Sequence, residues 1–274
     1  MGRYGKIALL MLAIVTAVAS VIFASREAVK EPAVAGAFYP ADGHELSRSV
    51  DGYLANAAAD PSGGRLIALI APHAGYMYSG QVAGYSYRQL TGRPVDTVIL
   101  VGASHFSSFA GASVYTEGGM RTPLGVVKIN EKIARSLLNE KAGVTFYRDA
   151  FLKEHSLEVQ LPFLQRTLKD VTVVPILMGA PTQASLSHLA DRLTEVMRKN
   201  ERVIIIASTD LSHYHDSPTA VGKDRKVIDA VTRMSVEDLQ GLLGSSEGEA
   251  CGGYPVLLTM MVSRNLGATN GVLY

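Results

Sequence analysis

Four short apolar runs, separated by segments with helical spacing, most constrain the fold of this chain. They occupy residues 66–71, 97–101, 171–177 and 202–207. A strand that is buried on both faces has a nearly unbroken hydrophobic sequence, as strands of parallel sheets do. Strands that alternate with helices in this way predict an α/β fold: a single domain with a mostly parallel central sheet flanked by helices.

The segments between the runs complete the expected secondary structure. Hydrophobic residues make up 47% of the 274 positions, enough for the core of one large domain. Pro162 is expected to kink the helix that contains it, because proline removes an internal hydrogen bond. Helices are expected at 45–58, 80–90, 131–138, 154–168, 183–199, 220–233, 236–243 and 254–264, with shorter strands at 112–115, 126–129 and 271–274.

Composition and motifs exclude several classes of function. Charged residues are 19% of the chain, the net charge is +1 and no basic stripe is present, so nucleic acid is not an expected partner. The chain has neither a Gly-x-x-x-x-Gly-Lys-Ser/Thr loop nor a Gly-x-Gly-x-x-Gly fingerprint, so no nucleotide cofactor is expected. It has no Gly-x-Ser-x-Gly elbow of an α/β-hydrolase, and its single cysteine excludes an internal disulfide.

The N-terminus has the pattern of an export segment. Arg3 and Lys6 precede an uncharged run at residues 7–24. The sequence Ala17-Val18-Ala19 fits a signal-peptidase site, whereas an uncut run is long enough to tether the chain by spanning a bilayer. Because the positive charges precede the run, the globular domain is expected outside the cytoplasm. We expect a signal peptide or N-terminal membrane anchor at 1–25, a linker at 26–31 and the globular domain at 32–274.

Two histidines and the only cysteine stand where a metal site is expected. His73 follows the run at 66–71, and His105 follows the run at 97–101. Strand ends are where open α/β sheets place their sites, and neutral imidazole is the commonest metal ligand. Cys251 precedes the helix expected at 254–264, and a helix N-terminus lowers the pKa of a thiol. The alternatives are core histidines bound to the backbone and an inert buried cysteine.

Two further pairs combine a carboxylate with an imidazole. His155 and Glu158 are three residues apart in an expected helix, so they share a face. Asp210 and His213 follow the run at 202–207, and a carboxylate beside an imidazole can orient a general acid or base. The alternatives are a surface pair near a helix start for the first and a helix cap for the second.

Taken together and in this order, the motifs resemble the Memo family, whose bacterial and archaeal members are called AmmeMemoRadiSam system protein B. The resemblance implies a fold similar to class III extradiol dioxygenases, the non-haem iron enzymes that open catechol rings. It also implies that His73, His105 and Cys251 bind iron or copper, with Asp210 and His213 beside them and His213 in the acid-base position. The resemblance to this family rests on the motifs at residues 35–40, 71–76, 102–105, 154–162, 208–214 and 251–252.

The expected function follows from this donor set. A thiolate in place of the usual carboxylate favours copper(I), zinc or a redox-poised iron, and weakens the case for ring cleavage. We expect a mononuclear metal protein with redox or dioxygenase-like chemistry on a small-molecule or peptide ligand. The alternatives are a non-enzymatic binding or scaffold protein on the same fold and an accessory partner of a radical-SAM-linked system. Because members of the family continue further, truncation at the C-terminus is also expected.

Overall fold

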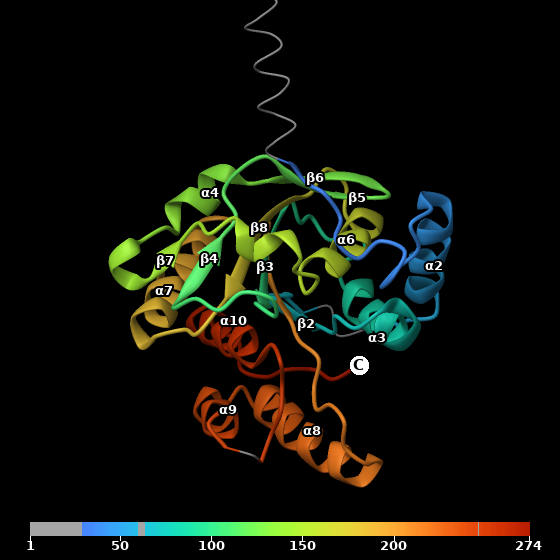
Figure 1. Ribbon diagram of the computed structural model, residues 1–274. Coiled ribbons are helices and arrows are strands. Elements are labelled where there is room, and N and C mark those ends of the chain that lie inside the picture. Colours follow the sequence, from blue (N-terminus) through green and yellow to red (C-terminus); the bar gives the residue numbers. More distant parts are fainter. Residues whose placement is uncertain (1–28, 60–63, 246) are drawn as a thin grey trace, which may run out of the picture.

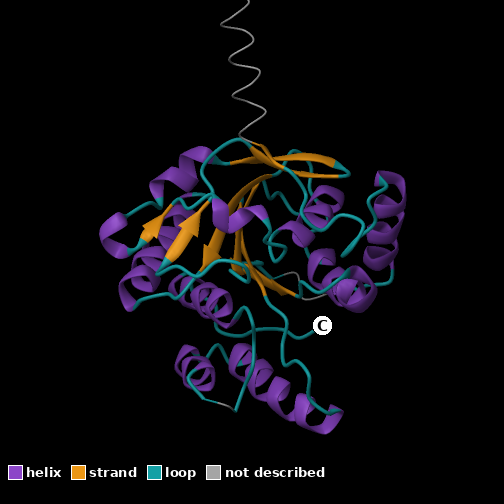
Figure 2. Ribbon diagram, in the orientation of Figure 1, coloured by secondary structure: helices purple, strands orange, loops and turns teal. Residues whose placement is uncertain are grey.

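The structure is a computed structural model that describes residues 29–59, 64–245 and 247–274 (Figure 1). A central sheet is flanked by helices on both sides (Figure 2). The signal peptide or anchor expected at 1–25 lies outside the described residues. Within the described part of the chain, no helix has both the length and the apolar character needed to cross a bilayer.

The centre of the sheet consists of the four apolar runs. They form β2 (Ala68–Ala71), β3 (Thr97–Ala103), β8 (Thr172–Met178) and β9 (Val203–Ser208), which pair in parallel in the order β8-β3-β9-β2. All residues of β9 are buried, as the unbroken hydrophobic sequence predicts. Ala71 is in register with Ser208, so β2 and β9 end side by side. The mostly parallel α/β fold is therefore confirmed, and its carboxyl-terminal strand ends share one edge.

Shorter strands extend the sheet on the β8 side. The antiparallel hairpin of β5 (Gly119–Thr122) and β6 (Gly125–Ile129) pairs with β8 through β6, and β1 (Val29–Lys30) joins β5 in parallel. Residues 29 and 30 thus belong to the sheet rather than only to the linker expected at 26–31, because a two-residue strand has no periodicity to detect. Two further strands, β4 (Ala112–Val114) and β7 (Val144–Thr145), pair with each other, and β4 runs antiparallel to β8.

The helices lie in two groups beside the sheet. Figure 1 shows α2, α3 and α6 on one side and α7 and α10 on the other, with α8 and α9 beyond α10. Local signals explain several helix starts: Thr182 and Ser185 form a capping box for α7, and Asp216 caps α8. The helices are α2 (Gly43–Ala55), α3 (Tyr76–Arg88), α4 (Glu131–Ser136), α5 (Asp149–Leu152), α6 (Leu161–Thr167), α7 (Gln183–Lys199), α8 (Ser217–Thr232), α9 (Val236–Leu243) and α10 (Gly253–Asn265).

Two expected elements are wrong. The helix expected at 154–168 begins only with a 3-10 turn at Glu158–Gln160, followed by α6. Pro162 lies in the first turn of α6, where its missing N–H is not needed, so it starts the helix instead of kinking it. In the described segment 247–274, no strand forms at 271–274, because the Gly271 N–H donates to Thr232 O (2.9 Å) at the end of α8.

Candidate metal centre

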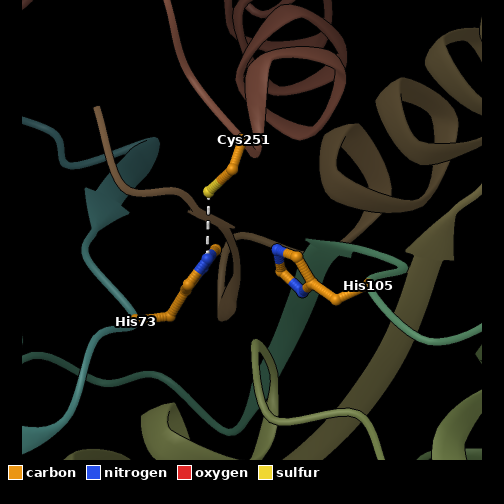
Figure 3. Close-up of side chains that lie close together, drawn as sticks. All are labelled: His73, His105 and Cys251. Carbon is orange, nitrogen blue, oxygen red and sulfur yellow. Dashed lines mark hydrogen bonds between the residues drawn. The ribbon is translucent and has the colours of Figure 1, made fainter. Parts of the chain in front are cut away.

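The structure brings together the three side chains that the sequence predicts as metal ligands. His73 lies just beyond β2, His105 just beyond β3, and Cys251 just before α10 (Figure 3). The Cys251 Sγ lies 3.0 Å from His73 Nε2, and one donor atom from each of the three residues lies within 4.8 Å of the others. The parallel register places both histidine loops at the same edge of the sheet. The position before α10 brings the thiol to that edge.

The close approach of these loops depends on glycine at two positions. A Cβ on Gly102, in β3, would lie 2.6 Å from Ser156 Oγ. A Cβ on Gly252, directly after Cys251, would lie 2.2 Å from the Ser208 carbonyl oxygen. Backbone atoms cannot move aside as a flexible side chain can, so only glycine lets the cysteine loop pack against the end of β9.

Each imidazole has its Nδ1 bound to a buried partner, which leaves Nε2 for the centre. His73 Nδ1 lies 2.9 Å from Ser208 Oγ, and His105 Nδ1 lies 2.9 Å from Glu154 Oε1. Metal-binding histidines nearly always have their second ring nitrogen held in this way, which fixes the tautomer and the orientation of the ring. His105 has a carboxylate as its partner and His73 a hydroxyl, so His105 is the more electron-rich donor.

Glu154 is the hydrogen-bond centre of the loop that carries His155. It is 2% exposed and accepts hydrogen bonds from the backbone N–H groups of His105 (2.6 Å), His155 (2.9 Å) and Ser156 (2.8 Å), besides His105 Nδ1. Burial raises the pKa of Glu154, but the hydrogen bonds, led by that of His105, outweigh it and lower the pKa to about 2. Because four N–H groups use its oxygens, Glu154 orients His105 rather than serving as a ligand itself.

The pKa shifts of Cys251 and His105 favour a thiolate–imidazolium pair between these two side chains. Burial raises the pKa of Cys251, but hydrogen bonds to His105 and His73 outweigh it and lower the pKa to about 6. The hydrogen bond to Cys251, followed by that to Glu154, raises the pKa of His105 to about 10. The backbone N–H of Asp210 also donates to Sγ (3.2 Å). The centre therefore stabilises a thiolate at neutral pH, the form in which cysteine binds metals.

Asp210 connects His73, Cys251 and His213. Its Oδ1 accepts the backbone N–H groups of His73 (2.8 Å) and Ala74 (3.3 Å), and its carbonyl oxygen accepts the N–H of Cys251 (3.2 Å). Its Oδ2 lies 3.8 Å from His73 Nε2 and 4.0 Å from His213 Nε2. The latter distance fits an ion pair but is too long for a hydrogen bond. His213 is half exposed, so it lies at the solvent side of the centre.

His155 lies with its ring against the centre, and its buried Nδ1 has no hydrogen-bond partner among the described residues. Its ring stacks on that of His105 with centroids 4.7 Å apart, and Phe38 covers it at 4.8 Å. Its Nδ1 is 3.6 Å from Glu154 Oε1, beyond hydrogen-bond distance. Burial, together with the nearby His105 and His73, lowers the pKa of His155, although Glu154 acts in the opposite direction. The His155 ring therefore forms one wall of the site, and its lowered pKa favours the neutral imidazole.

Glu158 faces the N-terminal segment instead of the centre. Its carboxylate accepts hydrogen bonds from Lys30 Nζ (2.7 Å), the Ala33 N–H (2.7 Å), the Val34 N–H (2.9 Å) and the Tyr39 hydroxyl (2.7 Å). The expectation that His155 and Glu158 share a face depended on a continuous helix through both residues. The chain is irregular before Glu158, so the two side chains point to different partners.

Sequence reasoning missed the residues that orient the imidazoles. In the sequence, Glu154 is only an acidic residue near an expected helix start, and no pattern assigns a role to Ser208 or Gln160. Ser208 ends the buried strand β9, and a polar side chain at the end of an apolar run beside a histidine loop is the signal that could have identified it. Lys30 and Glu158 are 128 residues apart in the sequence, so no local sequence pattern could predict that they form an ion pair.

The donor set suits a transition metal. Two imidazoles whose Nδ1 atoms are already held, together with a thiolate, match the preferences of iron, copper and zinc, and none of the three is a typical ligand of magnesium or calcium. Fold and site together define an α/β protein with a candidate His/His/Cys metal centre at the carboxyl edge of a parallel sheet.

Comparison with known proteins gives the family. The model of the family described as Memo-like protein matches residues 30–274. A MEMO1 family protein of Methanothermobacter thermautotrophicus is 35% identical over 252 residues, covering 88% of this chain and 90% of its own length. A MEMO1 family protein of Sulfurisphaera tokodaii is 31% identical over a match that covers 89% of this chain and 91% of its own length. One of Thermotoga petrophila is 35% identical over 84% of this chain and 88% of its own length. The chain therefore belongs to the Memo-like family, as its motifs indicate.

Proposed function

We propose that this protein binds one transition-metal ion through His73 Nε2, His105 Nε2 and Cys251 Sγ. The observation that carries the proposal is that three chemically suitable donors from distant parts of the chain converge, while both Nδ1 atoms are already held by buried partners. Hydrogen-bonded, correctly oriented imidazoles bind metal more tightly than free ones, because less freedom is lost on binding.

Iron or copper is the proposed metal, with zinc as the alternative. A thiolate with two imidazoles is compatible with all three, and the choice between them depends on oxidation state and supply. When bound, such an ion supplies Lewis acidity and, for iron or copper, the transfer of single electrons to or from a small-molecule or peptide ligand.

The residues around the centre have separable roles in this proposal. His213, with Asp210 Oδ2 at 4.0 Å, moves a proton between solvent and the ligand at its Nε2. His155 and Phe38 exclude water from one side of the His105 ring. Phe106, which is 58% exposed and lies edge-on to His155 at 6.0 Å, offers an aromatic contact to an entering ligand. Redox or dioxygenase-like turnover at this site is the activity that we propose.

An oxygen-consumption assay with catechols and thiols tests this activity on anaerobically purified, metal-loaded protein. Turnover that falls strongly in His213→Gln, while metal content stays unchanged, supports both the activity and the proton-transfer role. A protein that binds metal and consumes no oxygen would instead be a non-enzymatic binding protein on the same fold.

We also propose that residues 7–24 export the domain or tether it to a membrane. The support comes from the sequence: an uncharged run with positive residues before it. Cell fractionation, with the molecular mass of the recovered protein, distinguishes a cleaved leader from a retained tether. Recovery of full-length protein in the cytoplasm would contradict both.

A further inference from the structure

A buried hydrogen-bond chain leads to His73 Nδ1, and the direction of each hydrogen bond from Tyr87 to that atom is fixed. It joins four fully buried groups: the Tyr87 hydroxyl in α3, the Gln160 amide, the Ser208 hydroxyl and the His73 ring, all at most 2% exposed. The Tyr87 hydroxyl donates to Gln160 Oε1 (2.8 Å), and Gln160 Nε2 donates both to Ser208 Oγ (2.9 Å) and to the Pro72 carbonyl oxygen (2.9 Å).

The Pro72 carbonyl oxygen sets the direction of the first half of this chain. A carbonyl oxygen only accepts hydrogen bonds, so the atom of Gln160 that faces it must be the NH₂ group. The opposite amide orientation would place two oxygens against each other with no hydrogen between them. Gln160 therefore donates to Ser208, and one acceptor position of that hydroxyl is used.

The Ser156 carbonyl oxygen sets the direction of the second half. Ser208 Oγ lies 2.6 Å from it and has one hydrogen to donate, so that hydrogen points to Ser156. The remaining contact of Ser208 Oγ, at 2.9 Å to His73 Nδ1, then has to be one in which Ser208 accepts. His73 Nδ1 therefore carries a hydrogen, and its Nε2 is the nitrogen that faces the other proposed ligands, 3.0 Å from Cys251 Sγ.

We infer that Ser208, held by Gln160, is a positioning residue that fixes the Nδ1–H tautomer of His73 and so presents Nε2 as a ligand atom. The inference deepens the proposed metal site and rests on it for its purpose, although the tautomer itself exists without metal. Ser208 does for His73 what the Glu154 carboxylate does for His105. A neutral hydroxyl orients the ring and adds no negative charge behind it.

The test has one arm that needs no metal. Nitrogen-15 NMR of imidazole-labelled, metal-free protein distinguishes a protonated from an unprotonated His73 Nδ1. We expect a protonated Nδ1 in the wild type and in Ser208→Thr, which keeps the hydroxyl. We expect an unprotonated Nδ1 in Ser208→Ala, where the ring can turn its hydrogen to Nε2 beside the thiolate. An unprotonated Nδ1 in the wild type would overturn the inference, as would a Ser208→Ala pattern identical to that of the wild type.

The second arm measures affinity for cobalt(II), which reports thiolate ligation by its absorption. Ser208→Ala should weaken binding by about 10- to 100-fold, the usual effect of losing such a partner. Ser263→Ala is the matched control, because the Ser263 hydroxyl is also buried and donates to a carbonyl oxygen (Thr259, 2.7 Å) but lies outside the chain. Equal loss in the control would overturn the inference. A wild type that binds no cobalt would defeat the proposed function, while the NMR arm still decides the tautomer.

Discussion

Replacement of Glu158 by glutamine should destabilise the fold more than any change of an exposed charge. The Lys30 and Glu158 side chains are 5% and 2% exposed and their charged atoms are 2.7 Å apart. Removing one partner of a buried ion pair leaves the other charge without compensation, which costs about 3–5 kcal/mol. In Glu158→Gln the new NH₂ group also faces at least one backbone N–H in either amide orientation, Val34 on one side and Ala33 on the other, so we expect a loss in the upper part of this range.

The site should respond to the same change. Glu158 holds residues 30–39, and Phe38 in that segment covers His155 and accepts the Tyr76 N–H through its carbonyl oxygen (2.7 Å). Loosening the segment should therefore increase solvent access to His155, which hydrogen–deuterium exchange at its C2 position measures.

Urea denaturation of the metal-free protein, followed by circular dichroism, gives the free energy of unfolding. Asp51→Asn is the matched carboxylate-to-amide control, because Asp51 pairs with Arg166 on the surface, where such pairs contribute about 0–1 kcal/mol. The double variant Lys30→Met/Glu158→Gln should recover part of the loss, since neither charge then remains buried. A Glu158→Gln protein within about 1 kcal/mol of the wild type would refute this reasoning.

Three further predictions follow from the site. The alkylation rate of Cys251 in metal-free protein should rise with pH around a midpoint of about 6. His105→Ala should move that midpoint toward about 8.5, the pKa of a free thiol, and an unmoved midpoint would exclude the pairing of Cys251 with His105. Because the folded state lowers the pKa of Glu154 from 4.5 to about 2, its carboxylate stabilises the fold above pH 4.5, and this stability is lost as the pH falls toward about 2. Urea titrations at pH 2 to 6 should show that Glu154→Gln lacks about 3 kcal/mol of this acid dependence. An unchanged dependence of the unfolding free energy on pH would contradict the lowered pKa of Glu154. Gly252→Ala should abolish metal binding, because its new Cβ would lie 2.2 Å from the Ser208 carbonyl oxygen. The control Gly52→Ala, whose Cβ has nothing within 4 Å, should bind metal normally and stabilise α2 by up to about 1 kcal/mol. Similar metal titrations for the two variants would argue against close packing at Gly252.

The sequence predicts the sheet well because its central strands are buried on both faces. Strands β3, β8 and β9 appear as apolar runs, and their parallel order places His73 and His105 at one edge. Helices α7 and α9 match the expected ranges of 183–199 and 236–243, since their boundaries depend on local caps.

The sequence does not predict contacts that depend on irregular backbone or distant pairing. Residues 154–157 have helical spacing yet form a turn, because the Glu154 side chain accepts the backbone N–H groups of His155 and Ser156 in place of helical bonds. Strand β1 has only two residues, and Lys30 is buried because Glu158 lies opposite. Glu154, the partner of His105, becomes recognisable only once the loops are assembled, whereas Ser208, a polar residue at the end of an apolar run, leaves a signal in the sequence.

Metal content measured after anaerobic purification tests the central claim most directly. Wild-type protein should contain about one equivalent of iron, copper or zinc by mass spectrometry. His73→Ala and Cys251→Ser should contain almost none, while His188→Ala, which changes a histidine bound to Leu137 O far from these ligands in the sequence, should retain the wild-type content. Metal-free wild-type protein that takes up none of these ions on titration, or a Cys251→Ser protein with undiminished content, would contradict the account.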